Sequence, residues 1–237
     1  MKTRITLLML LCTLTAMAQS PKFEDFFVNK TLRIDYIFSG NSQQQEVNVK
    51  SLYQLNTWAG RRHNLDKLPL RGYGEIIMKD LTSGTTIYRT SFSTLFQEWL
   101  ATEEAQNTRK GFENTFLMPF PKNKVEINVT LYGDNGEHTA KTTHIVNPED
   151  ILIKKPQTTT PEYRYLMKSG KAEDCIDVAI LAEGYTAEEK ELFYTDAEIA
   201  CQSIFEHEPF KHLKERFNIV AVACISAESG VRVPREK

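Results

Sequence analysis

The sequence predicts an α+β protein of two domains, an N-terminal antiparallel β-sandwich followed by an incomplete α/β unit of β-α-β order. Three observations indicate this class. Apolar and polar residues alternate along much of residues 23–146, as in half-buried strands. Three prolines then frame a polar stretch, and beyond it short apolar runs flank one amphipathic segment. With 237 residues, 41% hydrophobic and 25% charged, the chain is long enough for two ordinary domains.

Residues 1–18 have the pattern of a secretory signal peptide. Lys2 and Arg4 precede an apolar run over residues 5–14, and Ala18 ends a small-x-small cleavage site. The apolar run is too short to span a bilayer comfortably. We therefore expect a secreted or periplasmic protein, cleaved after Ala18, with no membrane attachment after signal cleavage.

The composition also bears on partners and redox chemistry. A net charge of −2 gives no indication of nucleic acid or an anionic membrane as a partner, because both favour basic surfaces. Cleavage would leave Cys175, Cys201 and Cys224, an odd number, so at least one is unpaired within the chain and the pairing stays open. Cys175 and Cys224 lie in apolar runs, and we expect them to be buried.

The first predicted domain covers residues 21–147. Alternation is clearest over residues 31–38, 46–50 and 125–132, and glycine-containing turns separate such segments. Several strands of this kind predict an antiparallel sandwich. One short helix is expected over residues 94–105, and its candidates for the inward face are Leu95, Phe96 and Trp99.

Residues 148–162 are expected to form a linker, and residues 163–237 a truncated α/β domain. The apolar runs 175–181 and 217–225 predict two strands, and residues 186–206 predict the helix between them. Thr186 and Glu189 fit a capping box, with Thr186 as N-cap. Strands joined through a helix are parallel by default.

Two loops leave the carboxyl ends of these strands, at residues 182–185 and 226–230. Ligands of open α/β sheets bind at that edge, so the candidate cleft residues are Glu183, Tyr185, Glu228 and Ser229. The alternative is that the glycines of these loops only allow the chain to turn and that the acidic side chains are solvated.

The stretch His207–His212, HEPFKH, superficially resembles a zinc-binding motif. Residues five apart on a helix point about 140° away from each other and cannot grip one ion, and Pro209 disfavours a continuous helix. We expect solvated side chains there. The remaining histidines are expected to be surface or strand residues, namely His63, His138 and His144.

The second domain poses a packing problem. Strands that are apolar on both faces need helices on both sides of their sheet, whereas the sequence offers one long helix. A sheet of two strands cannot bury a core of its own. The sequence therefore predicts either a fragment of a longer protein or a sheet completed by a second polypeptide, and we favour the fragment.

Three segments resemble, in order, the start of the catalytic domain of the bacterial IgA-peptidase family (metallopeptidase family 64). They are residues 178–186 (VAILAEGYT), residues 217–222 (FNIVAV) preceded by Pro209 and Phe210, and residues 226–231 (SAESGV). The β-rich half resembles the N-terminal accessory domain of that family. The resemblance implies a secreted zinc peptidase acting on protein substrates, with a His-Glu-x-x-His helix that supplies two zinc ligands and the glutamate that polarises water.

In the family that helix lies downstream of the Glu-Ser-Gly segment, and the 237 residues contain no His-Glu-x-x-His. No residue therefore inherits a catalytic or metal-binding role, and we expect this chain itself to bind no zinc. The first hypothesis is the N-terminal portion of a secreted zinc metallopeptidase, inactive as given. The alternative is a secreted protein- or glycan-binding β-sandwich module.

Overall fold

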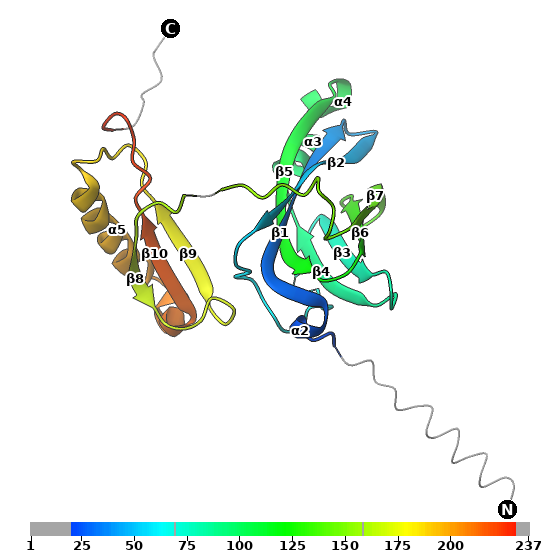
Figure 1. Ribbon diagram of the computed structural model, residues 1–237. Coiled ribbons are helices and arrows are strands. Elements are labelled where there is room, and N and C mark those ends of the chain that lie inside the picture. Colours follow the sequence, from blue (N-terminus) through cyan, green and yellow to red (C-terminus); the bar gives the residue numbers. More distant parts are fainter. Residues whose placement is uncertain (1–19, 69, 158, 231–237) are drawn as a thin grey trace, which may run out of the picture. The chain divides into compact units, whose positions relative to one another are not determined.

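The computed structural model describes residues 20–230 except residues 69 and 158 (Figure 1). The expected signal peptide therefore lies outside the described residues. The chain divides into two compact units. The first comprises the described residues through Trp58 together with Arg62–Lys155, and the second comprises Ala59–Arg61 and the described residues from Pro156 onward.

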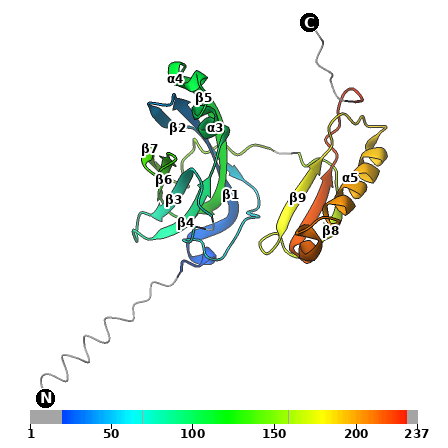
Figure 2. The ribbon, with the colours of Figure 1, turned by 180° about the vertical axis from the view of Figure 1, so that it is seen from behind.

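The first unit contains two antiparallel sheets, seen from opposite sides in Figures 1 and 2. The three-stranded sheet has the spatial order β2 (Gln45–Leu55), β1 (Phe27–Gly40) and β5 (Lys110–Pro121), and the short helix α2 (Phe23–Phe26) precedes β1. The four-stranded sheet has the order β4 (Thr86–Phe92), β3 (Gly74–Asp80), β6 (Val125–Tyr132) and β7 (His138–Val146).

One hydrophobic core joins the two sheets of the first unit. Alternate side chains of β1 and β6 are fully buried in it: Leu32, Ile34, Tyr36, Phe38, Val125, Ile127, Val129 and Leu131. Burial of one such side chain contributes about 1.5–3 kcal/mol. The predicted antiparallel sandwich is confirmed, since the period-two residues of both sheets face a shared interior.

The helix expected over residues 94–105 is two short helices, α3 (Leu95–Leu100) and α4 (Glu104–Asn107). Phe96 is fully buried and Trp99 packs against the core, as expected. The expectation for Leu95 was wrong, because its side chain is 71% exposed. Successive helical residues diverge by about 100°, and burying Phe96 turns Leu95 toward solvent.

The second unit is a three-stranded sheet with one long helix. Its strands have the order β8 (Tyr163–Lys168), β10 (Phe217–Val222) and β9 (Ile176–Leu181), and its helices are α5 (Lys190–Ile204) and the 3₁₀ helix η2 (Phe210–Arg216). Strand β10 is parallel to β9 and antiparallel to β8. The β-α-β order is confirmed, whereas the expectation of only two strands missed β8.

Helix α5 covers one face of this sheet. Phe193 and Ala197 of the helix are buried against Ala221 of β10. On β9, by contrast, no residue is fully buried, and Leu181 is 61% exposed. The expectation that both strands are buried on both faces therefore fails for β9 in the part of the chain that the structure describes.

The three cysteines of the second unit are free thiols. Cys201 on α5 is buried, Cys175 is half-buried and Cys224 is exposed, so the expected burial of Cys175 and Cys224 is not found. Among the described residues, no helix has both the length and the apolar character needed to cross a membrane.

Candidate functional site

The two loops singled out in the sequence meet at the carboxyl ends of β9 and β10. The two strands are parallel, with Leu181 opposite Val222, so the loops that follow them begin at the same edge of the sheet. The Ala182 N–H donates to the Val222 carbonyl at 3.0 Å and extends the pairing by one residue. The parallel register thus brings residues 182–189 beside residues 223–230.

Direct hydrogen bonds hold the two loops together. The Ser226 N–H donates to the Tyr185 carbonyl at 2.9 Å, and the Gly230 N–H donates to the Gly184 carbonyl at 2.8 Å. The Gly184 N–H in turn donates to the Ser226 hydroxyl at 2.9 Å. These three hydrogen bonds link the same two short segments. We refer to residues 182–189 and 223–230 together as the loop pair.

Glycine is required where the loops touch. Gly184 has φ +77°, a left-handed conformation that other residues adopt only with strain. A Cβ atom at this position would lie 2.6 Å from the Gly230 carbonyl oxygen. Gly230 also has a positive φ, +83°, but no atom lies within 4 Å of its Cβ position. Close backbone approach therefore depends on Gly184 in particular.

Glu189 links the loop pair to the start of α5. One carboxylate oxygen accepts the Thr186 N–H at 2.9 Å, and the other accepts the Ser229 hydroxyl at 2.7 Å. These hydrogen bonds, the backbone one first, lower the pKa of Glu189. The reaching-back contact expected of Glu189 is present, but α5 begins at Lys190, so Thr186 is not the N-cap.

Tyr185 is fixed against α5. Its hydroxyl donates to Asp196 at 2.8 Å, and its ring packs on Phe193 with a centroid distance of 5.4 Å. The bond to Asp196 raises the pKa of the Tyr185 hydroxyl, and partial burial adds to that rise. Tyr185 therefore positions the first loop on the helix.

Glu183 and Glu228 complete the set expected from the sequence. Both carboxylates are exposed, and within the described residues neither has a hydrogen-bond or ion-pair partner. The structure thus brings all four candidates to one edge but separates their roles. Tyr185 and Ser229 are engaged in holding the loop pair, whereas Glu183 and Glu228 face solvent.

The histidines do not assemble a metal site. Over residues 20–230, except 69 and 158, no group of three or more His, Cys, Asp or Glu side chains is placed to hold a metal ion. His207 and His212 are exposed, and His212 lies 3.0 Å from Glu208. The described residues do not fit a zinc centre, so we derive no catalytic step from them.

One histidine is less ordinary than the sequence indicates. His144 on β7 is half-buried, and its Nε2 atom lies 2.7 Å from the hydroxyl of the fully buried Tyr36. Burial lowers the pKa of His144, because the charged imidazolium is poorly solvated there. His144 is a strand residue, as expected, but its partner lies 108 positions away, beyond the reach of local patterns.

Comparison with known families matches the two halves of the chain in order. The model described as Peptidase M64 N-terminus matches residues 22–143, slightly more than half of the chain. The chain belongs to the M64 peptidase family. The model described as IgA Peptidase M64 matches residues 165–237. A search of curated proteins found no match for this M64 chain.

The two family matches correspond to different parts of the structure. The M64 N-terminus match falls on the β-sandwich, and the IgA Peptidase match begins within β8 and includes the loop pair. M64 is a family of metallopeptidases, which identifies the kind of enzyme to which this chain is related. The loop pair therefore lies in the part of the chain that resembles the peptidase itself.

Proposed function

We propose that this M64 chain is the N-terminal portion of a secreted zinc metallopeptidase that hydrolyses protein substrates. Residues 1–18 act as the signal peptide, residues 21–147 form the accessory sandwich, residues 148–162 form the linker, and residues 163–237 open the catalytic domain. The observation that carries this proposal is the match of both M64 models in the order accessory part, then peptidase part.

In this proposal the loop pair forms one wall of the substrate cleft. Parallel strands place their following loops at a shared edge, where α/β proteins bind ligands. The Gly184–Gly230 contact and the Glu189–Ser229 bond hold that edge in one shape. Glu183 and Glu228 flank the cleft, and Tyr185 and Ser229 position the loops that carry them.

The zinc ligands of the enzyme are supplied, in this proposal, by residues outside those described here. That reading rests on the family resemblance, which implies a His-Glu-x-x-His helix that the 237 residues do not contain. When bound, zinc lowers the pKa of its water and polarises the scissile carbonyl. Residues 19–237 alone would therefore be without peptidase activity.

Metal and activity measurements on purified residues 19–237 test this reading. We expect no stoichiometric zinc by elemental analysis and no hydrolysis of casein or immunoglobulin A. One tightly bound zinc per chain would contradict the assignment of the ligands to residues outside this chain. Secretion is tested separately by N-terminal sequencing of the mature protein, which should begin at Gln19.

A second candidate function is a secreted module that binds a protein or a glycan. The observation in its favour is that the sandwich has a continuous core of its own, built from both of its sheets. Expression of residues 21–150 alone tests it. A cooperative unfolding transition is expected of an independent module, and failure to fold would exclude it.

A further inference from the structure

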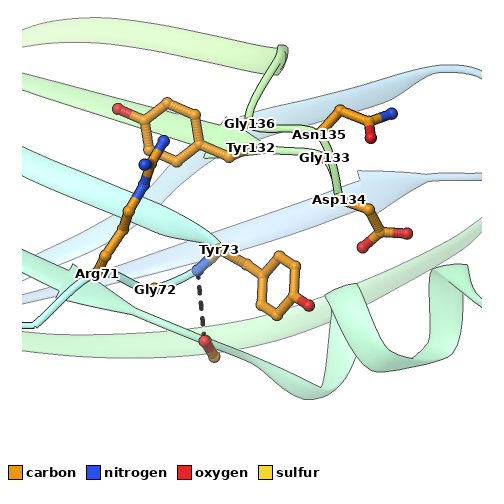
Figure 3. Close-up of a pocket in the computed structure, with 9 residues that line it drawn as sticks. Arg71, Gly72, Tyr73, Tyr132, Gly133, Asp134, Asn135 and Gly136 are labelled. Carbon is orange, nitrogen blue, oxygen red and sulfur yellow. Dashed lines mark hydrogen bonds between the residues drawn. The ribbon is translucent and has the colours of Figure 1, made fainter.

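A groove lies at one end of the sandwich in the first unit, and Figure 3 shows part of it. It consists of two adjoining pockets of about 430 and 360 Å³, whose linings share Tyr73, Ser93, Tyr132, Gly133 and Asp134. Tyr73 directly precedes β3, Ser93 follows β4, Tyr132 ends β6, and the other two lie in the turn between β6 and β7. We refer to the two pockets together as the strand-end groove.

The backbone that lines the strand-end groove is held in place by internal hydrogen bonds. The Tyr73 N–H donates to the Ser93 hydroxyl, drawn as a dashed line in Figure 3, and the Tyr73 carbonyl accepts the Tyr132 N–H at 2.8 Å. In the turn, the Gly136 N–H donates to the Gly133 carbonyl at 2.9 Å. These bonds fix the backbone at Tyr73 and in the turn, and side chains project from it into the groove.

Tyr132 forms a fixed wall. Its hydroxyl donates to Glu75 at 3.0 Å, and Glu75, only 5% exposed, also accepts a hydrogen bond from Arg89. Burial, and then the bond to Glu75, raise the pKa of Tyr132. This arrangement keeps the Tyr132 ring in one orientation.

Tyr73 is the opposite case, because the residue is 48% exposed although its backbone N–H and carbonyl are both hydrogen-bonded. An accessible aromatic ring on a fixed backbone offers an apolar face of large area at little entropic cost. Hydrogen-bonding side chains line the same pocket, and Figure 3 shows the Arg71 guanidinium beside the Tyr132 ring. Arg71, Asp134 and Asn135 are exposed, and in the described part of the chain none of their side chains makes a hydrogen bond or an ion pair with another side chain.

Charge and position narrow the ligand class. The lining contains the carboxylates of Glu98, Asp134 and Glu137 and the guanidinium of Arg71. Because carboxylates outnumber the cationic group, an anionic ligand is disfavoured. An extended peptide pairs with the edge of a sheet, whereas this groove is lined mostly by residues at strand ends and turns. A ring-shaped ligand with apolar faces and many neutral hydroxyls fits best.

We propose that the strand-end groove binds a neutral oligosaccharide. The Tyr73 ring packs against one face of a sugar, and Arg71, Asp134 and Asn135 hydrogen-bond to its hydroxyls. The proposal goes beyond the peptidase function and does not depend on it, because every contact lies within the sandwich. It also gives the binding-module alternative a defined site.

Residues 19–237 should first be tested on an array of neutral and sialylated oligosaccharides, followed by calorimetry with a neutral oligosaccharide that binds. Tyr73→Ala should weaken that binding about tenfold or more, as expected for loss of an aromatic contact. Tyr163→Ala is the matched control, because Tyr163 is a similarly exposed tyrosine, 52%, in the second unit. Its binding should equal that of the unchanged chain.

Asp134→Ala provides a second variant that does not alter an aromatic side chain, and it should also weaken binding. Unchanged thermal unfolding of both variants shows that they fold. The proposal is overturned if no neutral glycan binds, if only sialylated glycans bind, or if both variants bind as tightly as the Tyr163→Ala control. These outcomes are independent of whether the M64 chain carries zinc or peptidase activity.

Discussion

Replacing Gly184 by alanine should open the loop pair. At φ +77° an L-residue pays about 1–2 kcal/mol for the left-handed conformation. The new Cβ atom would also lie 2.6 Å from the Gly230 carbonyl oxygen, too close to remain there. The loops must then separate, and the hydrogen bond from Gly230 to Gly184 is lost at about 1 kcal/mol. Together these terms predict a loss of about 2–3 kcal/mol in the free energy of unfolding of the second unit.

Gly230→Ala is the matched control. Its φ is +83°, so it pays the same conformational cost of about 1–2 kcal/mol, but no atom lies within 4 Å of its Cβ position. The excess loss in Gly184→Ala, about 1 kcal/mol, therefore isolates the contact between the loops.

Urea unfolding of residues 19–237 measures both variants. The two tryptophans, Trp58 and Trp99, lie in the first unit, so the second unit needs its own probe. Cys201 is buried on α5, and its reactivity toward a thiol reagent, followed by peptide mass spectrometry, reports unfolding there. Hydrogen exchange at Ser226 and Gly230 should accelerate in Gly184→Ala. Equal losses in the two variants, with unchanged exchange, would refute the loop contact.

Three further predictions concern protonation and thiols. Burial lowers the pKa of His144, so the unfolded chain takes up a proton more readily than the folded chain. The free energy of unfolding, followed by tryptophan fluorescence, should therefore fall as the pH drops below about 6.5. His144→Gln should flatten that dependence, whereas exposed His63→Gln should retain it. The hydrogen bond from Arg33, assisted by Thr115, lowers the pKa of Asp35, so its contribution is complete above about pH 4 and is lost as the pH falls further. Asp35→Asn should lower the free energy of unfolding by about 1–3 kcal/mol at pH 7 and remove this acid-dependent part. Exposed Glu113→Gln should do neither, and equal pH dependence of stability in the two variants would contradict the assignment. At neutral pH a thiol reagent should modify exposed Cys224 in the native protein and Cys201 only on unfolding, and equal rates would show that α5 is not packed as described.

The parts of the fold that the sequence predicts are those in which one local pattern decides the outcome. Period-two alternation located β1 and β6, because each strand presents one face to a shared core. The loop pair was also predictable, since parallel strands joined by a helix must release their loops at one edge. Gly184 and Gly230 were visible as turn residues, but their mutual contact was not.

The parts that escaped prediction depend on neighbours distant in the chain. Strand β8 has few buried side chains, so it lacks the apolar pattern of a core strand and is defined by its pairing with β10. The bond from Ser229 to Glu189 spans 40 positions. The strand-end groove likewise combines turns whose side chains, such as Tyr73 and Tyr132, give no joint signal in the sequence.

The most direct test of the proposed metallopeptidase origin is to read the source DNA beyond codon 237. The proposed function predicts codons for a His-Glu-x-x-His motif downstream, either in frame or displaced by a frameshift. That motif would supply two zinc ligands and the catalytic glutamate. A stop codon at that point with no such series downstream in any frame would contradict it. The M64 relationship would then describe ancestry, and the binding-module function would become the account to pursue.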